Sequence, residues 1–382
     1  MYQYTNCIIC HKKGFIQCEQ CNKPYYFCSK EHLILHIQKS HKNLNDVKIN
    51  NDIRKEIAIN MSNQDYPSVI MLINNYLNSL KLQNQYNTNN NQIIIELLYT
   101  LAECHLNLSN LTESKNILNE IINLTEDLDN INNNINNNIS FQKIIFRQKT
   151  NMLLGAISLN LGEYNNALKA YFSCENDLPK ICKEPELNVK LSSVYLNIGL
   201  SYIYLGNKNI AIKYLKKALS QTEGILGNDI IHKLNADIFE NLGVTYEMMH
   251  RYKDSLIFYK KSLKLKFNLY GEANDEVLEL QYKISECYLS LKQFDQAEEI
   301  LGSIVELILK EKINQASQEI IYRYSTYFYS YGVVLMKLNR FNNAKIYFNK
   351  TLEIIEGFLL NNDPWIININ DLIKICDSKK IK

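Results

Sequence analysis

A spacing of small and apolar residues recurs roughly every 42 to 53 residues from about residue 53 onward. Each copy has a small residue in a first helical segment, an aromatic or other apolar residue three positions later, and a second small residue about a dozen positions beyond. The clearest copy contains Gly199, Tyr202 and Ala211, with Leu205-Gly206-Asn207 as the turn. Internal similarity of this kind predicts stacked helical hairpins, because each unit can bury its apolar stripe only against its neighbours.

Further copies extend the pattern over most of the chain. Clear copies include Gly155, Gly243, Ser285 and Gly332, and weaker ones centre on Ala58 and Ala102. The pattern resembles the tetratricopeptide repeat, with about seven units that exceed the usual length of about 34 residues. The extra length is similar to the long-helix variant found in kinesin light chains. The resemblance implies a mostly α-helical superhelix whose concave surface is lined by the first helix of each unit and suits a peptide or a partner helix.

The first tenth of the chain concentrates residues that bind metals. The candidate ligands are eight of the chain's 10 Cys and 7 His: Cys7, Cys10, Cys18, Cys21, Cys28, His32, His36 and His41. Thiolate and imidazole are preferred ligands of Zn²⁺, and a structural zinc ion takes four of them in a tetrahedron. Eight ligands therefore predict two closed structural zinc sites, with zinc as the only cofactor, although spacing alone does not pair the ligands.

The sequence around these residues resembles the MYND finger and its relative, the HIT finger. The similarity rests on CIIC, then CEQC, then the run from Tyr25 to Phe27 that leads into Cys28-Ser29-Lys30-Glu31-His32. It implies a cross-braced arrangement with Cys7, Cys10, Cys28 and His32 on one ion and Cys18, Cys21, His36 and His41 on the other. The chain departs from the family at His32, at the last ligands and in lacking a late tryptophan.

These features divide the chain into five segments. We expect a finger over 1–46, the first repeats over 47–125, an Asn-rich loop over 126–140, further repeats over 141–360, and a capping helix with a tail over 361–382. The loop is expected because residues 127–138 are a low-complexity tract dominated by Asn. The five remaining cysteines fall in apolar helical patterns and are expected in the core.

Charge and hydropathy exclude several classes of function. The formal charge is +2 and the isoelectric point is near 7.9, which lacks the basic signature of a nucleic-acid binder. We find neither a secretory signal nor an 18-residue apolar run, so we expect no membrane partner and a reducing, cytoplasmic location.

The candidate partner-binding residues lie on the first helices of the repeats. Asn197 and Asn241 each stand two residues before a Gly of the repeat. In peptide-binding tetratricopeptide proteins, an Asn at this register grips the ligand backbone. Glu240, Glu247 and Glu286 add an acidic bias that favours a basic partner. The alternative is that these residues form an ordinary solvated helix face.

No catalytic motif occurs, so we expect a protein that is not an enzyme and has no small-molecule substrate. The lysine methyltransferases of the SET-MYND group are excluded because their β-rich catalytic domain and its Asn-His-Ser-Cys signature are missing. The layout is similar to that of MYND-type finger proteins of the ciliary axoneme. That resemblance implies a non-catalytic adaptor that partners another repeat protein and dynein-arm components. The alternatives are a cytosolic assembly or transport factor that binds client or chaperone peptides, and a corepressor whose finger holds Pro-rich peptides.

Overall fold

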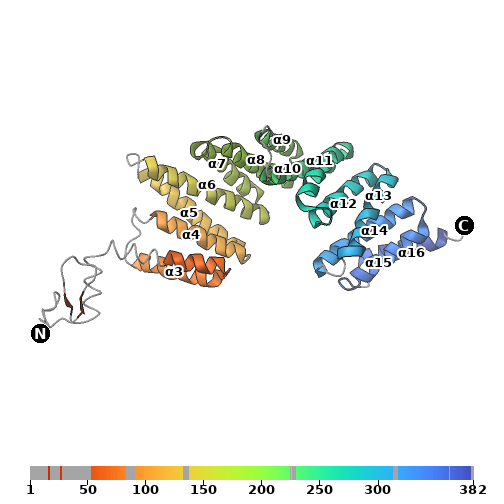
Figure 1. Cartoon of the computed structure of the whole chain (residues 1–382), viewed down its shortest axis with the longest axis horizontal. Coiled ribbons are helices and arrows are strands. Elements are labelled where there is room, and N and C mark those ends of the chain that lie inside the picture. Colours follow the sequence, from red (N-terminus) through yellow and green to blue (C-terminus); the bar gives the residue numbers. More distant parts are fainter. Residues whose placement is uncertain are drawn as a thin grey trace. The chain divides into compact units, whose positions relative to one another are not determined.

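The computed structural model describes residues 16–17, 26–27, 53–82, 91–131, 137–223, 225, 229–312, 317–360 and 362–379. The chain divides into two compact units, Met1–Asn136 and Asn137–Lys382 (Figure 1). Beyond residue 53 every described element is helical. The expectation of a mostly α-helical protein is confirmed for these residues.

A short β-hairpin is the only part of the predicted finger that the structure describes. Strand β1 (Ile16–Gln17) pairs antiparallel with β2 (Tyr26–Phe27), with Ile16 opposite Phe27. The eight predicted zinc ligands, Cys7, Cys10, Cys18, Cys21, Cys28, His32, His36 and His41, lie outside the described residues. The two zinc sites therefore stay a prediction.

The first unit contains two helix pairs. A helix at residues 53–62 precedes α3 (Tyr66–Leu82), and α4 (Asn91–Asn107) precedes α5 (Leu111–Ile131). Their apolar stripes form a core in which Val69, Ile73, Ile94 and Leu118 are fully buried. Burial of each such side chain stabilises the fold by about 1.5–3 kcal/mol.

The second unit contains five further pairs and a final helix. The pairs are α6 (Asn137–Asn160) with α7 (Tyr164–Ile181), α8 (Glu186–Tyr204) with α9 (Lys208–Thr222), α10 (Asp229–Met248) with α11 (Tyr252–Tyr270), α12 (Asp275–Ser290) with α13 (Phe294–Leu307), and α14 (Gln318–Lys337) with α15 (Phe341–Ile355). Helix α13 continues into a π-helical turn, η1 (Ile308–Lys312). Over the described residues the two units together hold seven pairs, the number that the repeat pattern predicts.

The same three-residue turn joins the two helices of every pair. Its central residue has a left-handed backbone with φ between 58° and 77°, and these residues are Gln64, Ser109, Gly162, Gly206, His250, Lys292 and Asn339. In the pair α8–α9, the N–H of Gly206 donates to the carbonyl of Ile203 and that of Asn207 to Tyr202. The other six turns repeat both bonds, which together form a Schellman motif. Only two of the seven central residues are glycine, so the other five turns carry no glycine that would mark them in the sequence.

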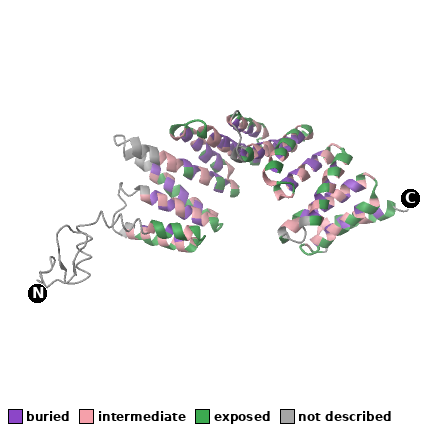
Figure 2. Ribbon diagram, viewed as in Figure 1, coloured by how far each residue is buried: buried purple, intermediate pink, exposed green. Residues whose placement is uncertain are grey.

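Small residues bring the two helices of a pair close together, as the sequence predicts. A Cβ added to Gly199 would lie 2.8 Å from Leu215, and one added to Gly243 would lie 2.4 Å from the ring of Tyr259. Ala211 is fully buried at the facing position. Figure 2 shows the buried residues gathered where neighbouring helices face one another, which is the packing expected of stacked hairpins.

The Asn-rich segment differs from the expectation of a loop over 126–140. Helix α5 continues to Ile131 and α6 already begins at Asn137, so only residues 132–136 lie outside the described helices. Asn costs a helix well under 1 kcal/mol relative to Ala. The two helices therefore include Asn-rich sequence whose composition is typical of loops.

Helix α16 (Pro364–Lys379) lies in the segment where a capping helix is expected. It packs on α15 and buries Ile366, Ile369 and Cys376. Cys104, Cys174 and Cys287 are buried as well, whereas Cys182 is only partly buried. Among the described helices, none combines the length and apolar character needed to cross a membrane.

Candidate partner-binding face

The first helices of the second unit share one side of the stack. Helix α8 contacts both α6 and α10, which are the first helices of the neighbouring pairs. We call the solvent-facing side of α8, α10, α12 and α14 the inner face. Residues two positions before the repeat's small residue occupy the same register on each of these helices: Asn197, Asn241, Lys283 and Ser330.

The two predicted asparagines differ in what they offer a ligand. The side chain of Asn197 is partly exposed and has no hydrogen-bond partner among the described residues. In Asn241 the amide Nδ2 donates to the backbone carbonyl of Asp237 over 2.8 Å. Asn197 therefore has its whole amide available, while Asn241 keeps its amide oxygen and one of its two N–H donors.

Ion pairs link three helix pairs across this face. The ammonium group of Lys266, whose side chain is only 6% exposed, lies 2.7 Å from Glu240 and 2.9 Å from Glu276. Lys283 lies 2.7 Å from Glu240 and 3.1 Å from Glu279. These residues come from α10, α11 and α12, and Arg323 of α14 approaches Glu279 at 4.0 Å.

The network sets the protonation of its members. Burial opposes ionisation of Glu240, but Lys283 and Lys266 outweigh it and hold the pKa of Glu240 below its usual value. Burial likewise disfavours the charged form of Lys266, yet Glu240 and Glu276 raise the pKa of Lys266. Both groups are therefore ionised at neutral pH. The carboxylate of Glu240, which the sequence offers to a basic partner, is already paired inside the protein.

Glu247 and Glu286 lie in a different environment. The phenol of Tyr259 donates to Glu247 over 2.5 Å, and the Oε1 atom of Glu286 is buried without a hydrogen-bond partner. Burial raises the pKa of Glu286, and the charge of Glu247 raises it further. The hydroxyls of Ser330 and Tyr282 oppose this shift in part. Among the described residues, neither carboxylate has an ion-pair partner.

Sequence reasoning missed the residues that define these two environments. Lys266 lies in the run KKSLKLKF, where nothing separates a buried lysine from exposed ones. Tyr282 and Ser330, whose hydroxyls are 3.2 Å apart, come from α12 and α14 and meet only in the stacked fold. The occurrence of Ser330 at the Asn register is the one signal that was available.

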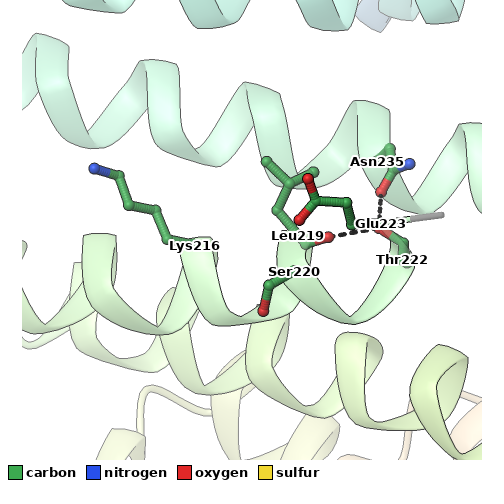
Figure 3. Close-up of a pocket in the computed structure, with 6 residues that line it drawn as sticks. All are labelled: Lys216, Leu219, Ser220, Thr222, Glu223 and Asn235. Carbon is green, nitrogen blue, oxygen red and sulfur yellow. Dashed lines mark hydrogen bonds between the residues drawn. The ribbon is translucent and has the colours of Figure 1, made fainter.

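A hollow of about 340 Å³ opens where α9 ends beside α10 (Figure 3). It is lined by Lys216, Leu219, Ser220, Thr222, Glu223 and Asn235. Thr222 donates a hydrogen bond to Asn235 over 2.6 Å, and three of the lining residues are exposed. These side chains include neither a nucleophile–base pair nor a set of metal ligands, and the described residues contain no group of three metal-binding side chains.

Comparisons with known proteins identify the repeats. Family models described as Tetratricopeptide repeat match residues 190–266 and 234–309, and another matches residues 325–357. Residues 190–309 and 325–357 carry tetratricopeptide repeats. A comparison with curated proteins finds no match.

Solved structures of similar fold are also found. The apo form of RapI is 15% identical with a TM-score of 0.59, and the similarity covers 86% of each chain. BtubC (BKLC) of P. vanneervenii is 16% identical with a TM-score of 0.51, covering 66% of this chain and 95% of that chain. At sequence identities this low, the similarity concerns the fold alone.

Proposed function

We propose that the chain is a non-catalytic scaffold that holds a segment of another protein against the inner face of its second unit. Tetratricopeptide repeats are protein-interaction modules, and stacked repeats present an extended surface suited to a peptide. The observation that carries the proposal is the unpartnered amide of Asn197 on this face. An amide with a donor and an acceptor can bind both backbone groups of an extended ligand.

Peptide selection on the full chain tests this proposal. A displayed peptide library is panned against the protein, and the affinity of the selected peptides is measured by calorimetry. We expect Asn197→Ala combined with Asn241→Ala to weaken binding about 30-fold, since each of the two lost hydrogen bonds costs about 1 kcal/mol. The matched control is Lys213→Ala with Lys253→Ala on the exposed surface of α9 and α11. Unchanged affinity in the Asn double variant would remove the inner face from the account.

We further propose that Cys7, Cys10, Cys28 and His32 hold one structural zinc ion and that Cys18, Cys21, His36 and His41 hold a second. Their residue types support zinc as the ion, and the resemblance to the MYND and HIT fingers supports this pairing. Elemental analysis of the purified chain should find two zinc equivalents, and Cys7→Ser should reduce the content to about one. A chain that contains no zinc after purification without chelators would contradict the proposal.

The finer proposal is an adaptor of the ciliary axoneme that partners another repeat protein and dynein-arm components. The layout of a finger followed by long repeats supports it, since this layout is similar to that of zinc finger MYND domain-containing protein 12 of motile cilia. In a ciliated cell the chain should remain with axonemal doublets in salt that strips soluble protein. Its complete recovery in the detergent-soluble cytosol would instead favour a cytosolic assembly or transport factor that binds client or chaperone peptides.

A further inference from the structure

We propose that Glu286 is a proton-sensitive switch in the stack: when its carboxyl takes up a proton, the contacts among α10, α12 and α14 tighten. Glu286 lies on α12, and Glu247 of the preceding first helix, α10, is the charged group that acts on it. These three helices contribute to the inner face. The switch belongs to the stack itself, so it does not depend on which segment the inner face holds.

Four helices from three consecutive pairs meet around Glu286. Its Oε1 atom is buried and has no hydrogen-bond partner. Tyr282 of α12 and Ser330 of α14, whose hydroxyls are 3.2 Å apart, lie beside the same carboxyl. The phenol of Tyr259 of α11 donates to Glu247 over 2.5 Å. A change in the charge of Glu286 therefore acts where consecutive hairpins pack on one another.

This cluster lacks a counter-charge. In the described part of the second unit, no cation pairs with Glu286 or Glu247. Lys283, one turn away on α12, lies 2.7 Å from Glu240 instead, and Lys260 of α11 lies over an aromatic ring of α12. Helix α13, which also packs on α12, contains no basic residue. When both carboxyls are ionised, two negative charges therefore act on each other without neutralisation.

The other ionisable groups around Glu286 stay neutral. Burial raises the pKa of Tyr282 to about 12 and that of Cys287 to about 11. Burial also raises the pKa values of Tyr259 on α11 and Tyr327 on α14. A change of pH in the neutral and mildly acidic range thus acts on the carboxyls of the cluster and not on its phenols or its thiol.

The environment determines the sign of the pH effect. Burial raises the pKa of Glu286, because the hydroxyls of Ser330 and Tyr282 offset only part of the penalty and Glu247 adds to it. The folded chain therefore keeps a proton at a pH where the unfolded chain, with a glutamate pKa of about 4.3, has released it. Stability falls as the pH rises through this range and stays lower above it.

Proton uptake removes both unfavourable features of the cluster. The repulsion from Glu247 disappears, and an uncharged acceptor without a partner is less costly to bury than a charged one. The hydroxyls of Ser330 and Tyr282 can accept as well as donate, so they can also serve the protonated carboxyl. The contacts of α12 with α10 and α14 therefore tighten in mild acid.

Urea denaturation of the full chain between pH 7.5 and pH 4.5 tests the switch. Glu286→Gln has the shape of the protonated carboxyl at every pH. We expect its unfolding equilibrium constant to be about fivefold smaller than that of the wild type at pH 7.5, and the difference to shrink towards pH 4.5. Glu353→Gln on the exposed surface of α15 is the matched control and should follow the wild type throughout.

Hydrogen exchange at pH 7.5 locates the effect. The amides of α12 and α14 should exchange more slowly in Glu286→Gln than in the wild type, and those of α7 should not change. Glu247→Gln keeps an acceptor for Tyr259 and removes the charge. In that background Glu286→Gln should stabilise the chain less, and the double-mutant cycle measures this coupling.

A carbon-13 titration of the glutamate carboxyls supplies a readout in the wild-type chain. The resonance that is missing from Glu286→Gln belongs to Glu286, and its midpoint should lie above that of Glu353. A midpoint at or below that of Glu353 would overturn the switch. So would a Glu286→Gln variant that is no more stable than the wild type at pH 7.5, or additive effects of the two glutamine substitutions.

Discussion

At the scale of single residues, the repeat pattern does not reveal which turn residues have a strained backbone or which buried side chains form ion pairs. Five of the seven turn centres place a side chain in the left-handed region: Gln64, Ser109, His250, Lys292 and Asn339. This conformation costs most residues about 1–2 kcal/mol, and Asn tolerates it better than Lys does. The surrounding hydrogen bonds and helix packing hold these turns in place.

Replacing Lys292 by glycine should stabilise the protein. The backbone at this position has a φ of 58°, and glycine removes the clash that a Cβ makes there. Glycine also raises the entropy of the unfolded chain, which offsets part of this gain. We therefore expect a net increase of about 0.5–1 kcal/mol in the free energy of unfolding. Asn339→Gly should give a smaller gain. Urea denaturation measures both, and destabilisation by Lys292→Gly would contradict the turn geometry.

Asp177 should make stability depend on pH in the acid range. Its side chain is 3% exposed, and Arg147 donates to both of its oxygens, at 2.8 and 2.9 Å. Burial opposes ionisation, but hydrogen bonds from Arg147 and Lys180 outweigh it and lower the pKa of Asp177. A lowered folded-state pKa adds stability above the unfolded value of about 3.9, and that stability is lost as pH falls through the folded-state pKa.

At pH 7, Asp177→Asn should therefore cost about 3 kcal/mol, since it breaks a buried pair. The difference from the wild type should shrink below about pH 4, as the wild-type carboxyl becomes protonated. Asp254→Asn breaks the exposed pair with Arg251 and should cost less than about 1 kcal/mol. Urea titrations at pH 7, 5 and 3 measure these differences. Equal losses for both variants at pH 7 would contradict the assigned burial.

At the scale of elements, the close approach of paired helices depends on the small residue in the first helix. Gly155, Gly199, Gly243 and Gly332 each face a large side chain of the second helix that an added Cβ would overlap. Tyr171, Tyr259 and Phe348 are among the largest fully buried side chains of the described core. The helix pair is thus a single packed unit rather than two independent helices.

Gly243→Ala should destabilise the protein through overpacking. The new Cβ would lie 2.4 Å from the ring of Tyr259, which is fully buried and cannot move freely. We expect a loss of about 1–3 kcal/mol. Gly357→Ala is the matched control, since its Cβ would meet only the carbonyl of Ile354 at 3.6 Å. Thermal unfolding followed by circular dichroism measures both, and equal behaviour of the two variants would argue against close packing at Gly243.

At the scale of the whole molecule, the sequence predicts the repeats but not the pattern of charge pairing. Small residues recur at spacings that only stacked helical pairs explain, so the pattern predicts that Gly199, Ala211 and Gly243 lie in the core. The partners of Glu240 could not be identified in this way. Lys266, 26 residues away, reaches Glu240 from the second helix of the same pair, and Lys283, 43 residues away, reaches it from the next pair because consecutive hairpins stack.

The Asn-rich segment is a place where the sequence composition predicts the wrong secondary structure. Its composition indicates a loop, yet the periodic apolar residues of α5 and α6 extend helical structure to Ile131 and from Asn137. The helix penalty of Asn is small, so a run of Asn does not by itself end a helix. Composition is therefore a weaker guide to element ends than periodicity is.

Site-specific photo-crosslinking in cells that express the chain tests the central claim most directly. A photoreactive amino acid replaces Asn197 or Asn241 on the inner face, or Lys213 or Lys253 on the exposed surface of the second helices. The account predicts a defined protein adduct from the inner positions, none from the outer ones, and suppression of the adduct by a selected peptide. Adducts that form only from Lys213 and Lys253, or that the peptide leaves unchanged, would contradict it.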